Sequence, residues 1–380
     1  MPISIDEVTT AAITSTGLSD FGSDDYLDGL QVLLNAANSS PHRGAGLDLR
    51  VKFTAISALE SRLRSQSGWS ARPECLTASL APQIVVVGLP RSGTTALHQM
   101  LAADPRFQWI PAWLAPNPRP RPASSEWDTD HDHMSAVENY QRTGPNALHD
   151  VAPDDPEECL QLMRQSFTSM LWVSSLPVPE YHEWFVNQDE RPSYSRFADN
   201  LRLIGADEPN RPWLLKNPSH TFGMAAMIDT FPDAVFIHIF RDPAESIVSG
   251  CSLIASLGLG DGTFNANELG AHRLRIWSMA AERFNSARDA NPGRKVIDVD
   301  YRKFVSDPLS SARDIYSSLG IDLEASTEVA MRKWHHDRPK DKHGTHRYSA
   351  EDFGLATAGI RDHMKDYVSR YSIDVGRSGR

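Results

Sequence analysis

The feature that most constrains the fold is a short apolar run that leads into a glycine-bounded loop. Residues 84–87 read Ile-Val-Val-Val without polar alternation, which is typical of a strand buried on both faces. The loop Gly-Leu-Pro-Arg-Ser-Gly follows at residues 88–93, and residues 96–102 are good helix formers at helical spacing. A strand, a tight loop and a helix start bring backbone N–H groups to one point. We therefore expect this loop to bind phosphate or sulfate oxygens.

The loop departs from the phosphate loop of ordinary nucleoside triphosphatases. Their pattern, G-x-x-x-x-G-K-[ST], has a lysine directly after the second glycine. Here Thr94 occupies that position, and the cation comes earlier, at Arg91. The displaced cation argues against an NTPase, and a P-loop kinase or NTPase is retained as the alternative interpretation.

Two further segments of the chain also pass from a predicted buried strand, through a basic residue, into a predicted helix. Residues 234–240 predict a second buried strand, followed by Arg241 and then, eight residues later, by Ser249 on a helix. An arginine fork gives planar, charge-assisted bonds to phosphate, and a serine adds a hydroxyl donor. In the third segment Lys216 ends a predicted strand, and His220 lies one turn into the next helix. Open α/β sheets bind ligands at the carboxyl ends of their strands, so we expect these side chains to share one edge.

Together these segments resemble the sulfotransferases that use 3′-phosphoadenosine 5′-phosphosulfate (PAPS), and in particular their bacterial sulfotransfer-3-like branch. Shorter matching pieces occur at residues 17–22, 154–159, 179–181, 301–304 and 346–355. The resemblance implies that Arg241 and Ser249 bind the 3′-phosphate and that Lys216 lies near the phosphosulfate. It also implies that the 5′-phosphosulfate is bound by the loop residues Arg91, Ser92, Gly93, Thr94 and Thr95.

The implied reaction moves a sulfuryl group from PAPS to a hydroxyl. Arg91 and Lys216 would stabilise the leaving phosphate. Sulfuryl carries less charge than phosphoryl, so we expect no metal. The acceptor hydroxyl needs a base within hydrogen-bond reach, and the candidates are His220, Glu157 and Glu158. A nucleotide-binding scaffold without turnover is the third interpretation, which Lys216 and His220 beside the loop argue against.

The amino-acid composition limits which classes of partner the chain is expected to bind. The formal net charge is -11, from 38 basic and 49 acidic residues, which disfavours nucleic acid and anionic membranes. The three cysteines have no C-x-x-C spacing, and no apolar stretch is long enough to span a membrane. We therefore expect a cytoplasmic protein. Aromatic and aliphatic residues between 107 and 184 favour a small apolar acceptor: a lipid, sterol-like or secondary-metabolite alcohol.

The predicted fold class is α/β, a P-loop-like three-layer sandwich with a central parallel sheet. Residues 1–80 are predicted to be a helical N-terminal region that packs against the sheet or against a partner subunit in a homodimer. Residues 81–380 would form the sulfotransferase α/β domain, with a substrate-covering insertion around 105–210. Within these regions we expect helices over residues 26–34, 47–63 and 157–172, a strand over 295–299, and an exposed polar loop at residues 131–133.

Overall fold

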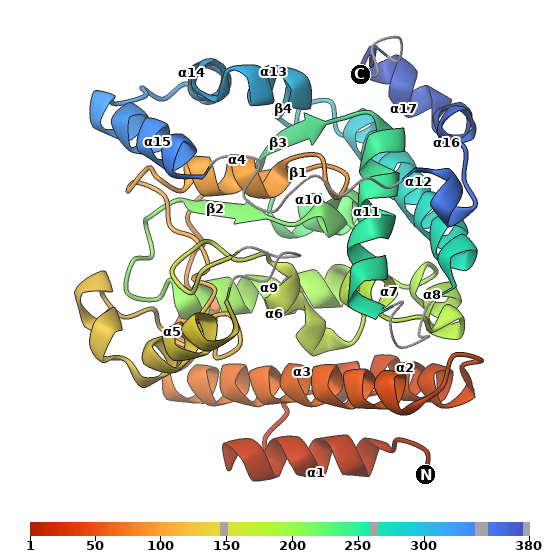
Figure 1. The fold of residues 1–380 in the computed structure, drawn as a ribbon. Helices are drawn as coiled ribbons and strands as arrows, with labels where there is room; N and C mark the ends of the chain where they lie inside the picture. Colours follow the sequence, from red (N-terminus) through yellow and green to blue (C-terminus); the bar gives the residue numbers. More distant parts are fainter. Residues whose placement is uncertain (145–150, 259–264, 339–348, 375–380) are drawn as a thin grey trace. The chain divides into compact units, whose positions relative to one another are not determined.

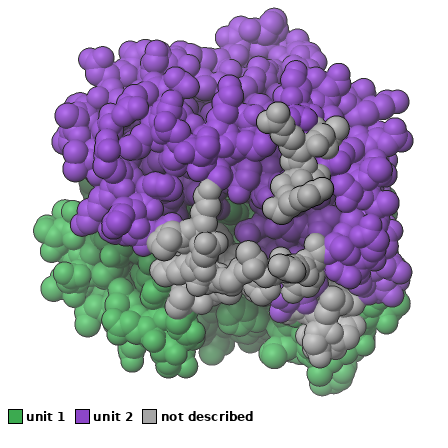
Figure 2. Space-filling model, turned by 45° about the horizontal axis from the view of Figure 1, so that its top comes forward, with its two compact units in different colours: residues 1–82, 109–211, 261–263 green, residues 83–108, 212–260, 264–380 purple. Residues whose placement is uncertain are grey.

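The chain folds into two compact units, which are coloured separately in Figure 2. A computed structural model describes residues 1–144, 151–258, 265–338 and 349–374. The first unit consists of the described parts of Met1–Pro82 and Trp109–Arg211, and the second of those of Gln83–Gln108, Pro212–Gly260 and Phe264–Arg380. The chain segment before the first strand therefore folds together with the segment that separates the first two strands.

The first unit is helical, and its N-terminal part agrees with the sequence-based expectation. The helix expected over residues 26–34 is α2, and the one expected over 47–63 lies within the long α3, along which α1 packs (Figure 1). None of the described helices of the chain combines the length and the apolar composition that a bilayer crossing needs. The elements of this unit are α1 (Ile5–Thr16), η1 (Asp24–Tyr26), α2 (Leu27–Ser39), α3 (Ala45–Ala71), η2 (Pro73–Thr77), η3 (Ser124–Thr129), α5 (His131–Thr143), α6 (Leu160–Met163), η4 (Arg164–Ser166), α7 (Met170–Ser175), α8 (Pro179–Phe185) and α9 (Arg191–Ile204).

A buried arginine organises the loop before α2. The Arg62 side chain is fully buried, and it donates to the carbonyl oxygens of Phe21 at 2.8 Å and Ser23 at 2.6 Å. Its guanidinium also pairs with Asp25 and lies 4.4 Å from the centre of the Tyr26 ring. A buried charge needs such partners to offset its desolvation. The run at residues 17–22 therefore leads into a loop that α3 anchors.

The helix expected over residues 157–172 is wrong. The structure has α6, η4 and α7 in its place, and Phe167 between η4 and α7 adopts a left-handed backbone with φ of 55°. A helix cannot continue through that conformation. The Ser169 side chain then accepts from the N–H of Leu171 and starts α7 as a new helix. Apolar composition alone did not reveal this break.

The second unit contains a four-stranded parallel sheet of order β2-β1-β3-β4, which confirms the predicted α/β class. In the register, Val86 pairs with Lys216 and with Ile237. The strand expected over residues 295–299 is β4. The elements are β1 (Gln83–Val87), α4 (Thr94–Leu101), β2 (Trp213–Lys216), η5 (Pro218–Thr221), α10 (Met224–Thr230), β3 (Val235–Phe240), α11 (Pro243–Gly258), α12 (Ala266–Ala290), β4 (Val296–Asp300), α13 (Tyr301–Ser306), α14 (Pro308–Leu319), α15 (Ala325–Asp337), η7 (Glu351–Phe353), α16 (Thr357–His363) and α17 (Lys365–Arg370).

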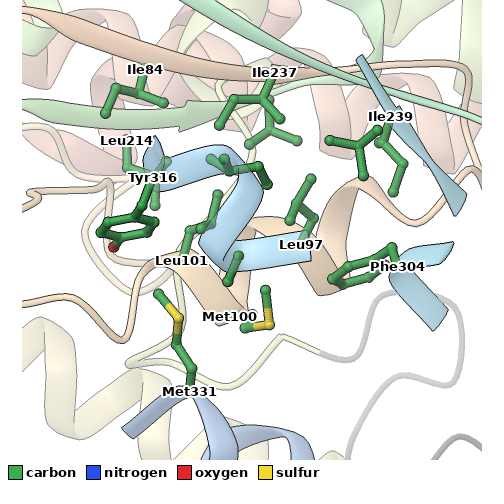
Figure 3. Close-up of a cluster of buried hydrophobic side chains, with 14 of the residues drawn as sticks. Ile84, Leu97, Met100, Leu101, Leu214, Ile237, Ile239, Phe304, Tyr316 and Met331 are labelled. Atoms are coloured by element: carbon green, nitrogen blue, oxygen red, sulfur yellow. The ribbon is translucent and has the colours of Figure 1, made fainter. Parts of the chain in front are cut away.

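Helices cover both faces of this sheet. On one face, strand residues such as Ile84 and Ile237 pack against Leu97 and Met100 of α4 and against residues of α13–α15 (Figure 3). On the other face, the His238 ring lies 4.6 Å from that of Phe284 on α12. These are the three layers that the sequence predicts, and burial on both faces explains the continuous apolar strands.

The C-terminal motif at residues 346–355 lies only partly within the described residues. Residues 346–348 lie outside the described residues. The remainder forms η7, whose Phe353 carbonyl oxygen would lie 2.1 Å from a Cβ placed on Gly270 of α12. Glycine is therefore required where α12 meets η7.

Candidate active site

The loop after β1 is tightly wound and depends on its glycines. Gly88 has φ of 154°, and a Cβ there would lie 2.2 Å from the carbonyl oxygen of Ile239 on the neighbouring strand. The buried Ser92 hydroxyl donates to the Leu89 carbonyl oxygen at 2.7 Å and closes the turn. Arg91 is exposed and has φ of 65°, a strained conformation of the kind found at functional sites.

The start of α4 completes this loop. Gly93 precedes the helix with φ of 96°, and no side chain caps the first N–H groups. These groups have no partner within the helix, and the helix dipole adds partial positive charge there. A Cβ on Gly93 would lie 2.8 Å from the Tyr301 ring, so the ring packs directly on the loop. The arrangement suits an anion, as expected from the sequence.

Lys216 ends β2 and contacts the first turn of α4. Its side chain is fully buried, and Nζ donates to the Thr95 hydroxyl at 3.1 Å. The two residues are separated by 121 positions in the sequence. A buried ammonium requires polar partners, so the folded chain holds this positive charge beside the loop.

Arg241 follows β3 and also reaches the loop. Its Nη1 donates to the Arg91 carbonyl oxygen at 2.9 Å, and its guanidinium carbon lies 4.3 Å from the centre of the Tyr301 ring. The Arg91 side chain in turn donates from Nε to the hydroxyl of Ser249 on α11 at 3.3 Å. Residues expected at two different phosphates of one ligand are therefore in direct contact.

A small depression lies beside Arg241, where β3 and β4 end. Asp242 on its wall pairs with Arg361 of α16 at 2.6 Å, which fixes the turn into α11. The lining residues are Phe240, Arg241, Asp242, Glu245, Asp300, Arg302, Arg361, Ile373 and Asp374. This mixed polar surface adjoins the arginine that we expect at the 3′-phosphate.

His220 lies in η5, four residues after Lys216, and is fully buried. Burial lowers its pKa to about 3, so its imidazole is neutral at physiological pH. Burial and the Lys216 charge likewise lower the pKa of His98 on α4 to about 3. The His98 Nε2 lies 3.3 Å from the Leu214 carbonyl oxygen, and the neutral ring can therefore tie α4 to β2 as a donor.

Glu157 and Glu158 belong to the first unit, unlike the other candidate site residues. Glu157 is buried, and its carboxylate accepts from the backbone N–H of Glu158 at 2.7 Å. Its own N–H donates to the Ile110 carbonyl oxygen. Glu157 thus has local structural contacts, and a catalytic role for either glutamate stays a prediction.

The exposed loop expected at residues 131–133 is wrong. These residues form the first turn of α5, which Asp130 caps by accepting from two backbone N–H groups. His133 is buried, and its Nε2 lies 2.6 Å from an Asp154 carboxylate oxygen. Within the described ranges, no three His, Cys, Asp or Glu residues are arranged to hold a metal ion.

Two contact residues were not predicted as part of the site. Tyr301 was noted only as part of a short motif, yet its ring contacts the loop at Gly93 and faces Arg241. Glu245 pairs with Arg241 at 2.7 Å. Its position four residues after the arginine, on a helix that begins at Pro243, was the signal available in the sequence.

Comparisons with known proteins identify the family of this chain. A family model described as the sulfotransferase family matches residues 82–325. The structure of sulfotransferase STF1 from Mycobacterium tuberculosis is similar, with a TM-score of 0.87 and 35% identity over 96% of this chain and 99% of that one. The chain belongs to the sulfotransferase family.

Two further relatives extend the comparison. Sulfotransferase STF9 from Mycobacterium avium has a TM-score of 0.89 and 26% identity, covering 99% of this chain and 98% of that one. The omega-hydroxy-beta-dihydromenaquinone-9 sulfotransferase Stf3 of Mycobacterium bovis is 23% identical over 305 residues, which are 77% of this chain and 76% of that protein.

Proposed function

We propose that the protein transfers a sulfuryl group from PAPS to a hydroxyl of a small apolar acceptor. The observation that carries the proposal is the convergence at one edge of the sheet. Lys216, the loop from Gly88 to Gly93 and Arg241 lie at the carboxyl ends of the adjacent parallel strands β2, β1 and β3. Arg241 donates to the loop at Arg91, and Lys216 donates to Thr95 in the first turn of α4. Parallel strands expose their carboxyl ends together, where α/β enzymes bind ligands.

The donor would be bound at both of its phosphate ends. Arg241 and Ser249 would bind the 3′-phosphate through the guanidinium fork and a hydroxyl. The 5′-phosphosulfate would be bound by the N–H groups at the start of α4 and by the side chains of Arg91, Thr94 and Thr95. Ser92 would contribute by holding the turn, because its hydroxyl donates to the Leu89 carbonyl oxygen. A Cβ at Gly88 would meet the Ile239 carbonyl oxygen, and one at Gly93 would meet the Tyr301 ring, so glycine at both positions permits the tight winding that this binding mode needs.

Transfer breaks the bond between sulfur and the 5′-phosphate oxygen and forms one between sulfur and the acceptor oxygen. Negative charge grows on the leaving phosphate of 3′-phosphoadenosine 5′-phosphate (PAP), where Arg91 and Lys216 would stabilise it. The hydroxyl proton would go to His220, Glu157 or Glu158. Burial lowers the pKa of His220, which keeps its imidazole neutral and also makes it a weaker base.

The apolar acceptor is supported by one relative. Stf3 is named for a hydroxylated menaquinone-derived lipid. The aromatic residues between 107 and 184 support it less than expected, because Trp113, Phe167 and Trp172 are buried core residues of the first unit. The cytoplasmic location and the homodimer remain predictions.

Radiolabelled sulfur tests the proposal. Purified protein would be incubated with ³⁵S-labelled PAPS and a lipid extract, and labelled products would be identified by mass spectrometry. We expect label in an alcohol-derived sulfate ester, in parallel with release of PAP. Phosphate transfer from ATP with no sulfate transfer would instead support the kinase alternative.

A further inference from the structure

The guanidinium of Arg241 is held from three sides by three different elements. The Glu245 carboxylate of α11 accepts from Nε at 2.8 Å, and the same oxygen lies 2.7 Å from Nη2 in an ion pair. The Arg91 carbonyl oxygen accepts from Nη1, and the Tyr301 ring lies against the face. Arginine has five N–H donors. Two of them, on Nε and Nη1, donate to described residues, and the fork can therefore also donate to an oxyanion.

One of these three partners is negatively charged. A carboxylate beside the arginine adds like charge next to the 3′-phosphate. It also helps to orient the fork, but the Arg91 carbonyl oxygen and the Tyr301 ring already supply orientation. Removal of the Glu245 charge should therefore change the orientation of the Arg241 guanidinium little, while it removes the repulsion between the carboxylate and the 3′-phosphate.

We propose that Glu245 is a specificity-determining residue that weakens the hold of Arg241 on the 3′-phosphate and so favours release of PAP. This inference rests on the proposed function, because it assumes that Arg241 binds that phosphate. At a separation of about 6 Å and an effective dielectric constant of about 40, one like charge lowers affinity roughly tenfold. Ligands that lack the 3′-phosphate should not sense it to this extent.

The pair is suited to mutation. The side chains of Arg241 and Glu245 are 23% and 50% exposed, and ion pairs at such sites contribute little to folding. Glu245→Gln keeps a side-chain oxygen that can accept from Arg241 while it removes the charge. Glu245→Asp keeps the charge on a shorter side chain. Glu282→Gln, at an exposed position of α12, makes the same charge change elsewhere.

Calorimetric titration would measure the affinities of PAP and of adenosine 5′-phosphate, which lacks only the 3′-phosphate. Glu245→Gln should bind PAP roughly tenfold more tightly than the wild type, with adenosine 5′-phosphate changed less than about twofold. Glu245→Asp and Glu282→Gln should stay near the wild type.

Three outcomes would overturn the inference. PAP affinity in Glu245→Gln could be unchanged or weaker, which would make orientation the main effect of Glu245. The affinities of PAP and of adenosine 5′-phosphate could increase equally in Glu245→Gln, which would mean that the charge acts on the whole site without selecting the 3′-phosphate. If the wild type binds no PAP, the proposed function fails and this inference fails with it.

Discussion

Among single residues, Arg241 tests the donor site through binding alone. We expect Arg241→Ala to weaken PAP binding by roughly 10- to 100-fold, because a hydrogen bond to a charged group contributes roughly 1.5 to 3 kcal/mol. Titration calorimetry measures this directly. Arg313→Ala is the control, since Arg313 is an exposed arginine of α14 that pairs with Glu328. Equal losses in both variants would remove Arg241 from the donor site.

Lys216 should act on the chemical step more than on PAP. PAP lacks the sulfuryl group and does not report contacts made mainly in the transition state. Lys216→Ala should therefore lower kcat by roughly 10²- to 10³-fold, the usual loss for one stabilising donor. Its Kd for PAP should change less than about threefold. Because Lys216 is buried, a melting curve must show that the variant is folded. Full turnover would contradict the leaving-group role.

The pH dependence of turnover tests His220 as the base. Only the neutral imidazole accepts a proton, and burial lowers the pKa of His220 to about 3. Protonation of His220 should therefore reduce kcat/KM only below about pH 4, and His220 should add no acid limb between about pH 5 and 8. His220→Ala should lose roughly 10²- to 10⁴-fold at every pH in that range.

The variants Glu157→Gln and Glu158→Gln, measured over the same pH range, test the two glutamates as alternative bases. If a glutamate is the base, its variant should show the larger loss, and His220→Ala should lose little activity. A wild-type acid limb near pH 6 that survives in His220→Ala would likewise assign the proton to another group.

The sequence predicted which residues gather at the candidate site better than it predicted their contacts. The loop from Gly88 to Gly93, Lys216 and Arg241 follow local patterns of strand, glycine and cation. The bond from Lys216 to Thr95 joins positions 121 apart, and only the sheet register brings them together. Local sequence patterns carry no signal for a contact of that kind.

At the scale of elements, the loop after β1 should tolerate no added methyl group. Gly88→Ala places a Cβ 2.2 Å from the Ile239 carbonyl oxygen, on a backbone with φ of 154°. We expect loss of PAP binding and a lower melting temperature. Gly250→Ala on α11 meets nothing within 4 Å, and it should stabilise the helix by up to about 1 kcal/mol. Normal PAP binding by Gly88→Ala would contradict the loop geometry.

Elements were predictable where their periodicity was strong and uninterrupted. The strands β1 and β3 follow continuous apolar runs. The break at Phe167 did not follow from composition, because apolar residues continue on both sides of it. His133 was misassigned because its partner Asp154 lies 21 residues away, so the local sequence does not reveal that contact.

For the whole molecule, the net charge of -11 opposes the binding of a polyanionic nucleotide. Long-range attraction is not available to such a chain, so affinity must come from local groups. Arg91, Lys216, Arg241 and the start of α4 supply positive charge at one edge of the second unit. The division into two units was not apparent in the sequence, because each unit is assembled from separated segments.

The central claim is that this edge binds the nucleotide product of sulfuryl transfer, and calorimetric titration of the wild type with PAP tests it most directly. We predict one saturable site for PAP and a rise in melting temperature, because a ligand that binds only the folded state stabilises it. ATP and GTP should bind far more weakly. Tight binding of ATP or GTP with no binding of PAP would contradict the account.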